Sequence, residues 1–460
     1  MLFSSIPFLF FFLTAIIALY YAVPFKLKNT VLLLFSLFFY AWGGVKYAGL
    51  MIIAILLGYV FGLLIEKFRE KKIAKLFVGL AVACIISFML YFKYMDFFID
   101  NFNKLLGTEI PLLKIVLPIG ISFYTFQIIS YVVDVYRGEK AQKNPINLAA
   151  YVAMFPQLIA GPIIKYKDLD EQLDSRTHSL DRFASGVERF LVGLAKKLLL
   201  ANNLGQLWDV FKAMPGERLT LLGAWLGVTA FAFQIYFDFS GYSDMAIGLG
   251  RMFGFEFMEN FNYPYISKNI TEFWRRWHIS LSTWFREYLY IPLGGNRCSK
   301  GRWLLNLLIV WAATGIWHGA SWNYLLWGLY FFCLLILEKL LVGKWLKKLP
   351  GPVQHLYVIF LVLVSWAIFA LEDLGQLGAY LTAMAGLSGA PMVSSETIYH
   401  FKNFLPVFLC AAVGSTPLPA KLWRRVKSSA AQVILLILGL IICTAYVVAS
   451  TYNPFLYFRF

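Results

Sequence analysis

Long apolar segments that carry almost no charge dominate this sequence and restrict what it can fold into. A helix needs about 20 mainly apolar residues to cross the hydrocarbon core of a membrane. Segments of this kind lie near residues 7–23, 30–42, 46–66, 76–93 and 112–134. Charged residues make up only 14% of the chain, compared with about 25% in soluble proteins. The sequence therefore predicts an all-α protein that crosses the membrane many times.

The chain length sets the expected number of spans. The 460 residues would hold about eleven spans of ~20 residues each, so we expect one bundle over residues 1–460 rather than several domains. The first apolar segment has no basic residues before it and no small-residue cleavage site, which favours a retained helix over a signal peptide. The five cysteines show neither disulfide nor metal-ligand spacing, so no metal is expected.

Clusters of basic residues between the apolar segments indicate the topology. Lys26 and Lys28, the run 67–75 and the run 137–143 fall on one side of the membrane if each segment crosses once. Basic loops favour the cytoplasmic side, so we expect the N-terminus outside. The net charge of +16 is then explained by topology and contact with anionic lipids. Nucleic acid is not an expected partner, because no basic stripe with interleaved aromatic residues is present.

The apolar segment YVAMFPQLIAGPIIK, residues 151–165, is interrupted by residues that break helices. Pro156 and Pro162 lie close together in it, and proline inside a helix removes a backbone hydrogen bond. The segment therefore predicts a kinked or re-entrant element that lines a cavity. Residues 166–188 are polar, and we expect them at a surface, with His178 in a solvated loop.

Two carboxylates lie within a later apolar segment. Asp238 and Asp244 belong to QIYFDFSGYSDMAIGLG, and acidic residues inside a membrane are costly unless they pair or function. One interpretation is that they bond to helix backbone broken around Gly241 and pair with a nearby arginine. The other is that they line a functional tunnel. No histidine or third acid stands at a spacing that would complete a metal site.

Residues 260–302 form the longest polar segment of the chain, and we expect it at the cytoplasmic interface. The pattern predicts an amphipathic helix that starts near Ile270, is capped by Ser267 or Asn269, and ends before Pro292. Its tryptophans and arginines are typical of a helix in the membrane interface. Snorkelling anchors explain this pattern, and so does binding of a donor's phosphates. The arginines concerned are Arg275, Arg276, Arg286 and Arg297.

Two of the five histidines stand in unusual positions. His278 lies on the predicted interfacial helix, and His318 lies at the end of an apolar run, in GIWHGASWNYLLWG. An ionisable residue in a membrane segment is a functional candidate. Because imidazole titrates near neutral pH, His318 is suited to act as a general base toward a hydroxyl. A structural histidine bonded to a carbonyl is the alternative interpretation.

Three ordered motifs resemble the membrane-bound O-acyltransferase family, specifically its bacterial polysaccharide O-acetylation branch. They are FDFSGYSDMAIG (237–248), FWRRWHISLSTWFREYLYIPLGGNR (273–297) and WHGASWNYLLWG (317–328), with FPQLIAGPI (155–163) as a further match. The resemblance implies a ring of helices around a central tunnel that joins a cytoplasmic donor site to the outer face. It also implies that His318 is the catalytic base and that His278 assists it. The residues expected to support or line the tunnel are Asp238, Asp244, Trp317 and Asn323.

The resemblance further implies a donor, a relay and partners. Acetyl-CoA is the expected donor, because this sequence contains the motifs SGYSD and IPLGGNR, from which the related D-alanyl branch for teichoic acids usually departs. The tail 453–460, NPFLYFRF, resembles a terminal peptide in which a tyrosine, here Tyr457, relays the acyl group, and a phenyl ester is activated for such transfer. An aromatic belt at the membrane interface is the alternative. An extracytoplasmic SGNH-type transferase would then acetylate a polysaccharide outside the bacterial cytoplasmic membrane.

A transporter or flippase is an alternative of a different class. In that case Asp238, Asp244 and His318 would relay protons or bind substrate at the midplane. Such proteins contain repeats with matching broken helices, and this sequence has one set of polar, broken segments between residues 151 and 302 without a counterpart. A structural scaffold would need neither a histidine in the membrane nor a basic interfacial helix. No residue indicates which polysaccharide would be the acceptor.

Overall fold

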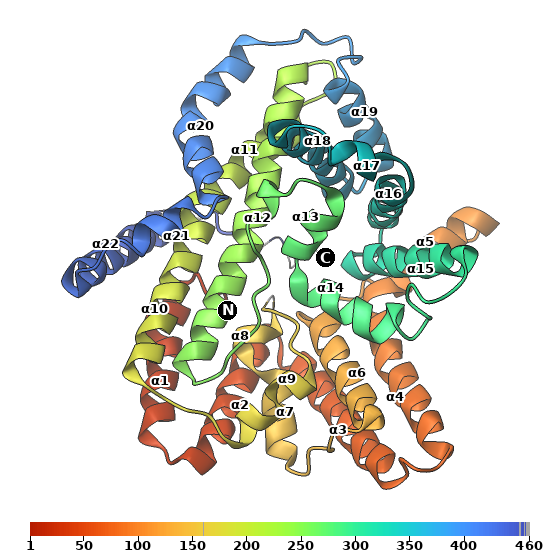
Figure 1. Cartoon of the computed structure of the whole chain (residues 1–460), viewed down its shortest axis with the longest axis vertical. Coiled ribbons are helices and arrows are strands. Elements are labelled where there is room, and N and C mark those ends of the chain that lie inside the picture. The colour runs from red at the N-terminus through yellow and green to blue at the C-terminus, as the bar shows by residue number, and fades with distance from the viewer. Residues whose placement is uncertain (160, 450–451, 455, 457–460) are drawn as a thin grey trace. The chain divides into compact units, whose positions relative to one another are not determined.

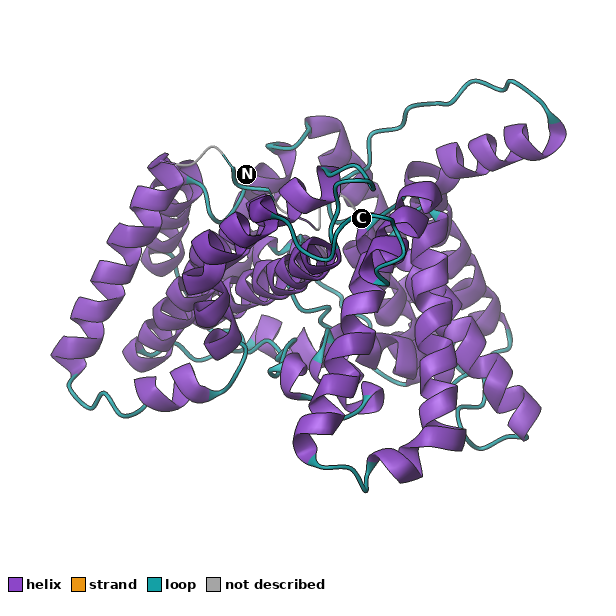
Figure 2. Ribbon diagram, turned by 90° about the horizontal axis from the view of Figure 1, so that it is seen from above, coloured by secondary structure: helices purple, strands orange, loops and turns teal. Residues whose placement is uncertain are grey.

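A computed structural model describes the whole chain except residues 160, 450–451, 455 and 457–460. All regular elements of this described part are helices (Figures 1 and 2), which confirms the predicted all-α class. The chain forms two compact units. Unit 1 contains residues 1–190 and 243–258, and unit 2 contains residues 191–242 and 259–460. Two of the three boundaries fall inside helices, α10 (Leu180–Ala195) and α12 (Leu221–Met252), and the third lies in the loop after α12.

Unit 1 is built around four apolar helices. In it α3 (Val45–Lys67), α4 (Ile73–Met89) and α6 (Ile121–Arg137) pack on one another, and α2 (Phe25–Ala41) packs on α3. A sharp reversal joins α2 to α3, and Gly44 takes a φ of 144° there, which only glycine adopts readily. The remaining elements are η1 (Pro7–Phe12), α1 (Leu13–Ala22), η2 (Leu90–Tyr94), α5 (Met95–Leu106), α7 (Pro145–Ala153), α8 (Phe155–Leu158) and α9 (Tyr166–Asp174).

Unit 2 carries the second half of the chain, and an aromatic core lies between α12, α16 and α18. Its other elements, beginning after α10, are η3 (Lys196–Ala201), α11 (Asn202–Ala213), η4 (Pro264–Ile266), α13 (Ile270–Arg276), α14 (Ile279–Phe285), η5 (Arg286–Tyr290), α15 (Lys300–His318), α16 (Trp322–Leu337), η6 (Glu338–Val342), α17 (Gly343–Leu346), α18 (Gly351–Ala370), α19 (Leu374–Met384), α20 (Ser395–Gly414), α21 (Leu418–Trp423) and α22 (Ser429–Ala449).

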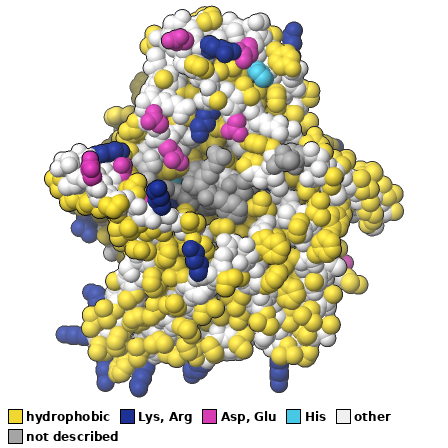
Figure 3. Space-filling model, turned by 180° about the vertical axis from the view of Figure 1, so that it is seen from behind, with side chains coloured by type: hydrophobic (Ala, Val, Ile, Leu, Met, Phe, Trp, Pro, Cys, Tyr) yellow, Lys and Arg dark blue, Asp and Glu magenta, His cyan; other side chains and the backbone are white. Residues whose placement is uncertain are grey.

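Several helices have the length and composition of membrane spans. In the described part of the chain, six helical stretches are long and apolar enough to cross a membrane. They are Val45–Lys67, Ile73–Leu106, Leu221–Met252, Trp322–Leu346, Gly351–Ala370 and Ser429–Ala449. Hydrophobic side chains cover most of the face in Figure 3, as expected where lipid replaces water around the protein. Pro7–Ala22 is a shorter apolar helix in the described part of the chain, and the expected number of about eleven spans stays a prediction.

The interrupted segment 151–165 is kinked, as its prolines predict. Helix α7 ends at Ala153 and the short α8 begins at Phe155, directly before Pro156. The break frees the Phe155 N–H, which donates to the Ser36 hydroxyl of α2 at 3.0 Å. A buried backbone donor must find such a partner once the helix ladder is interrupted.

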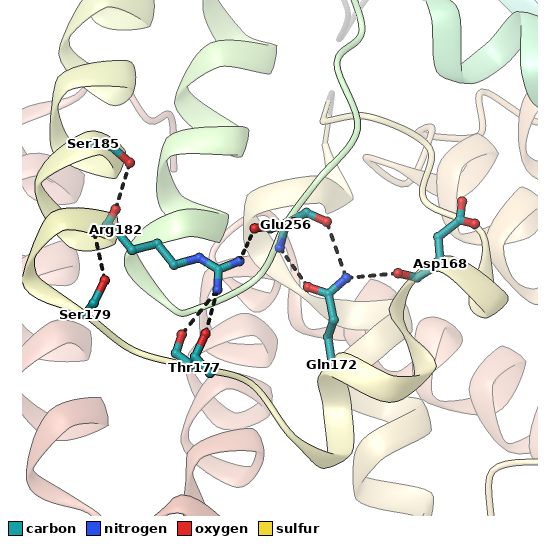
Figure 4. Close-up of polar contacts among 7 residues, drawn as sticks. All are labelled: Asp168, Gln172, Thr177, Ser179, Arg182, Ser185 and Glu256. Carbon is teal, nitrogen blue, oxygen red and sulfur yellow. Dashed lines mark hydrogen bonds and ion pairs between the residues drawn. The ribbon is translucent and has the colours of Figure 1, made fainter.

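A polar network fixes the loop between α9 and α10 (Figure 4). Arg182 donates to the Thr177 carbonyl and hydroxyl and pairs with Glu256 at 2.8 Å. Gln172 exchanges side-chain hydrogen bonds with the backbone of Glu256. The same loop holds His178, whose Nε2 lies 2.9 Å from the Tyr20 hydroxyl. His178 lies in a loop, as predicted, but it is only partly exposed, because its ring packs on Tyr20 and Tyr21.

Candidate functional site

His278 lies at the junction of α13 and α14 in an unusual backbone conformation. The sequence pattern predicts one continuous helix here, and the structure shows two short ones, because the chain turns at Trp277 and His278. His278 has φ 44° and ψ 55°, in the left-handed region. Non-glycine residues are uncommon there, and such strain clusters at functional sites. The turn places the imidazole inside unit 2 with only 1% of the residue exposed.

Asn260 determines which nitrogen of His278 carries the proton. The Asn260 Oδ1 atom accepts hydrogen bonds from the Ser280 N–H at 3.2 Å and the Ser280 hydroxyl at 2.9 Å, and it lies 3.1 Å from His278 Nδ1. Since a backbone N–H can only donate, the atom facing it is the amide oxygen, and His278 Nδ1 must donate to that oxygen. The lone pair of the neutral ring therefore lies on Nε2. Burial lowers the pKa of His278 to about 3, which favours this neutral form.

Two side chains anchor the N-terminal end of α13, the helix that leads to His278. The side chain of Asn269 accepts the Glu272 N–H at 2.7 Å and caps the helix, as the sequence predicts. The buried carboxylate of Glu338 accepts the N–H groups of Ile270 and Thr271. A carboxylate at a helix N-terminus also interacts favourably with the helix dipole. These contacts fix the start of α13, so its far end presents His278 in one position.

His318 is the last residue of α15, at the turn into α16. The two helices approach closely because Gly315 and Gly328 face each other. A Cβ on Gly315 would clash with the Tyr324 carbonyl, and one on Gly328 would clash with the Trp311 carbonyl. The glycines of GIWHGASWNYLLWG therefore serve the packing that places His318, which is 7% exposed.

Aromatic rings surround both histidines. The His318 ring centre lies 5.0 Å from that of Trp327 and 5.2 Å from that of Phe369, in edge-on geometry. The His278 ring lies 4.7 Å from Phe239. Trp317 contacts both imidazoles, with ring centres 6.1 Å from His278 and 5.1 Å from His318. The tertiary structure thus brings the two histidines against one shared indole in an apolar surrounding, where electrostatic interactions are strong.

The four candidate phosphate-binding arginines do not converge on one point. Arg276 is engaged within the protein, because it pairs with Glu272 at 2.9 Å and donates to the Asn262 carbonyl. Arg286 is largely exposed and lies 3.6 Å from its neighbour Glu287. Arg275 and Arg297 are exposed, and their side chains make no hydrogen bond or ion pair with the described residues. Arg276 is therefore a structural residue here, and donor binding by the others stays a prediction.

Asp238 and Asp244 are both paired, as one of the two interpretations predicts, but their partners differ. In unit 1 the Arg189 side chain contacts Asp244 at 2.6 Å. In unit 2 the partner of Asp238 is a lysine, Lys197, at 2.7 Å, and both side chains are 3% exposed. The expected backbone break around Gly241 is wrong, because α12 runs through it. Gly241 instead permits close packing, since a Cβ there would lie 2.7 Å from the Gly193 carbonyl.

The remaining predicted positions divide into two groups. Asn323 is structural, because its buried amide donates to the Ile368 and Phe369 carbonyls at 3.1 and 2.9 Å and ties α16 to the end of α18. Trp317 belongs to the site through both histidines. Tyr457 lies outside the described residues. The described residues before it, Tyr452, Pro454 and Leu456, contact α11, η3 and α12 respectively.

A small cavity connects that segment with the surroundings of His318. It has a volume of about 40 Å³ and is lined in part by Pro454, Leu456 and Tyr324. Tyr324 contacts Phe369, with ring centres 5.1 Å apart, and Phe369 contacts His318. Gln234, 3% exposed, also lines the cavity, and its Oε1 accepts no hydrogen bond from the described residues. The cavity thus adjoins both the tail and the aromatic shell of the catalytic candidate.

Sequence reasoning missed several residues of this arrangement. Asn260, Glu338 and Lys197 act through partners that are distant in sequence. A signal existed for Lys197, because it stands in the apolar run GLAKKLLLA, where a buried lysine needs an acidic partner. No comparable signal marks Asn260, because it stands in a segment that is polar throughout.

This chain shares much of its sequence with known proteins. Residues 4–350 match the sequence model of MBOAT, the membrane-bound O-acyltransferase family. The chain is 46% identical over 380 residues to a probable alginate O-acetylase of Azotobacter vinelandii, covering 81% of this chain and 76% of that protein. It is 40% identical to the Pseudomonas putida protein of the same name over the full length of both. A peptidoglycan O-acetyltransferase of Helicobacter pylori is 34% identical, over 85% of this chain and 81% of that protein.

Proposed function

Since this chain belongs to the membrane-bound O-acyltransferase family, we propose that it passes acetyl from cytoplasmic acetyl-CoA across the bacterial cytoplasmic membrane to an extracytoplasmic polysaccharide. That it is a membrane O-acyltransferase follows from the family itself. The acetyl group and the polysaccharide are supported by its relatives, which are named as alginate O-acetylases and a peptidoglycan O-acetyltransferase. The N-terminus then lies outside, with the three basic clusters of the first half of the chain in the cytoplasm.

The meeting of His278 and His318 on Trp317 is the observation that carries this proposal. In the first step a hydroxyl oxygen attacks the thioester carbonyl of acetyl-CoA, and His318 takes the hydroxyl proton. The carbon–sulfur bond then breaks, and the proton passes to the leaving thiolate to give CoA. His278, held with its lone pair on Nε2 by Asn260, polarises or orients the reacting groups. The exposed Arg275, Arg286 and Arg297 are suited to the phosphates of CoA.

The hydroxyl of the first step is assigned to Tyr457. The product is an acetyl phenyl ester, which is more reactive than an alkyl ester and can hand the acetyl group on. A partner transferase of the SGNH type outside the membrane then moves the acetyl to a sugar hydroxyl and regenerates the phenol. This division of labour is consistent with a chain whose described part carries no large domain beyond its helices.

D-alanyl transfer is the second candidate for the same site. A teichoic acid D-alanyltransferase of Bacillus subtilis is 29% identical, but over only 54% of this chain. The alginate O-acetylases are more similar and cover more of the chain. A transporter receives no support from these relatives, and the buried acids that it would use are already held in ion pairs.

The test is the intact mass of the purified protein after incubation with acetyl-CoA, followed by peptide mapping. The wild type should gain one acetyl group on the peptide that contains Tyr457. The His318→Ala and Tyr457→Phe variants should gain none while still folding. If acetyl-CoA leaves no acetyl group on any peptide and remains unconsumed, the acetyl proposal fails, and a D-alanyl carrier protein becomes the donor to test.

A further inference from the structure

The buried Lys197–Asp238 pair has a second set of partners, which belong to the C-terminal segment. The Lys197 ammonium donates to the Pro454 carbonyl, and the Asp238 Oδ2 accepts the Leu456 N–H at 2.9 Å. The ammonium and carboxylate contact each other at 2.7 Å and are both 3% exposed. A buried ion pair is favourable only if its remaining donors and acceptors are also satisfied. Here the tail backbone supplies one acceptor to the ammonium and one donor to the carboxylate.

Two further side chains contact the same segment. Asn202 donates to the Tyr452 carbonyl at 3.2 Å and to the Asn453 side-chain oxygen at 3.3 Å. The Tyr452 hydroxyl donates to the Asp209 carboxylate at 2.7 Å. Gly205 leaves the space for that phenol, because a Cβ on Gly205 would lie 2.9 Å from the Tyr452 hydroxyl oxygen.

The contacts follow the pattern of extended-peptide recognition. Side chains of unit 2 bind the main chain at residues 452, 454 and 456, while Tyr452 and Leu456 act as side-chain anchors. Leu456 is 7% exposed and belongs to the hydrophobic core of unit 2. Main-chain hydrogen bonds combined with pockets for alternate side chains define both the position and the register of a bound peptide.

We propose that Lys197, Asp238, Asn202 and Asp209 form a peptide-binding groove whose occupant is the chain's own C-terminal segment, held at Tyr452, Asn453, Pro454 and Leu456, and that this groove sets the register of the tail. This inference rests on the proposed function: by holding the tail, the groove positions the acceptor hydroxyl for the acetyl transfer. Leu456 directly precedes Tyr457 in the sequence, so the proposed groove acts on the residue next to the acceptor tyrosine. The four groove residues are therefore positioning residues, distinct from the histidines that move the proton.

A simple structural tether is the competing explanation, and the contacts argue against it. A tether needs only an apolar anchor, whereas this segment receives a buried lysine and a buried aspartate on its main chain. The charges lie two residues apart along the tail, at Pro454 and Leu456. Because these main-chain groups repeat along the tail, the register itself is specified by the side-chain anchors, the Tyr452 hydroxyl on Asp209 and the buried Leu456 side chain.

The experiment measures hydrogen exchange in the terminal peptide of the full-length protein by mass spectrometry, together with acetylation of that peptide. Two variants remove the groove contacts. In Lys197→Met/Asp238→Leu the pair is replaced by apolar residues, which are often tolerated in place of a buried ion pair. In Leu456→Pro the ion pair stays and only the tail loses its N–H donor. Leu456→Ala also removes the leucine side chain but keeps the N–H, so comparing it with Leu456→Pro separates the loss of the donor from the loss of the anchor. Lys402→Met, on the exposed side of α20, is the neutral control.

We expect amide exchange in the tail to be at least about tenfold faster in Lys197→Met/Asp238→Leu than in the wild type, since the Leu456 N–H loses its buried hydrogen bond. In Leu456→Pro that amide is absent, and the neighbouring tail amides should exchange faster because the tail is released from the groove. Acetylation of Tyr457 should be lost in parallel, and Lys402→Met should match the wild type. Unchanged exchange in both groove variants would overturn the groove. If exchange accelerates while polysaccharide acetylation continues in membranes, the groove stands and the Tyr457 relay of the proposed function fails.

Discussion

At the scale of single residues, a backbone conformation and one amide determine what His278 can do. The left-handed φ of 44° turns the ring away from the helical direction of α13. The Asn260 oxygen then assigns the ring proton to Nδ1. The same oxygen holds Ser280, so the amide cannot rotate without losing three contacts. His278 is thus fixed in position, tautomer and charge before any substrate binds.

The two histidines can be tested with variants that keep the backbone. We expect His278→Asn to remain folded, because asparagine tolerates the left-handed region better than most residues. Acetyl transfer should fall by about 10²- to 10⁴-fold in both His278→Asn and His318→Ala, as when a general acid–base group is removed. Initial rates of CoA release in detergent would measure this loss, with the melting temperature as the control for folding. Full activity in His318→Ala would show that His318 is not the catalytic base.

Asn260 can be tested through the pH dependence of the reaction. The Asn260→Asp variant should keep the contact with His278 Nδ1 while placing a carboxylate beside the ring. A neighbouring negative charge stabilises imidazolium and raises the pKa of His278. The neutral ring would then be lost at higher pH, so the acidic limb of the pH–rate profile should move upward. A profile identical to that of the wild type would show that His278 does not titrate in the rate-determining step.

At the scale of elements, close helix packing decides where the functional groups stand. The hairpin of α15 and α16 depends on Gly315 and Gly328, which let the two backbones touch. Small residues serve this purpose widely in membrane helices. The kink between α7 and α8 depends in the same way on Ser36, which satisfies the freed backbone donor.

Gly328→Ala tests the packing of the hairpin. The new methyl group would meet the Trp311 carbonyl, so we expect a loss of about 1–3 kcal/mol in stability, the usual cost of overpacking. Activity should fall as well, because the packing of α15 against α16 also sets the position of His318. Gly439→Ala on α22 is the matched control, since a Cβ there meets nothing within 4 Å. Equal melting temperatures of the two variants in detergent would contradict this account.

The loop between α9 and α10 should make unit 1 sensitive to acid. Burial, together with the nearby Lys28 and Arg176, lowers the pKa of His178 to about 4. The unfolded chain binds a proton at this residue near pH 6.5, while the folded chain stays neutral. The contribution of His178 to stability is therefore complete above pH 6.5 and is lost as the pH falls toward 4.

His178→Gln isolates this effect from other titrating groups. The wild type should lose more thermal stability than the variant when the pH is lowered from about 7 to about 5, because only the wild type carries the perturbed imidazole. Thermal melts in detergent at both pH values measure the difference. Parallel losses in the two proteins would show that His178 makes no such contribution.

At the scale of the whole molecule, charge distribution sets the orientation in the membrane. If the loops 67–75 and 137–143 are cytoplasmic, cysteines placed at Lys72 and Lys140 should resist a membrane-impermeant maleimide in intact cells and react in inside-out vesicles. Both positions are exposed, so accessibility depends on the side of the membrane. The unmodified chain, with its five native cysteines, is the control. Labelling of either loop from outside would reverse the predicted topology.

The sequence by itself determined the features that depend on local order. Apolar length predicts helices, Pro156 predicts the kink, Asn269 predicts a helix cap, and the motifs around His278 and His318 predict the family. Each of these features depends only on the side chains of one segment and on their spacing, so it can be predicted from residues that are close together in the sequence.

Only the tertiary structure decided which distant residues meet. The pairing of Lys197 with Asp238, the Asn260–His278 bond and the shared contact of both histidines with Trp317 join separate segments. Each depends on how helices pack, and the same polar residue can be satisfied by many alternative partners until packing selects one. The binding of the tail to η3, α11 and α12 likewise has no sequence signature, because the groove contacts mainly the backbone of the tail.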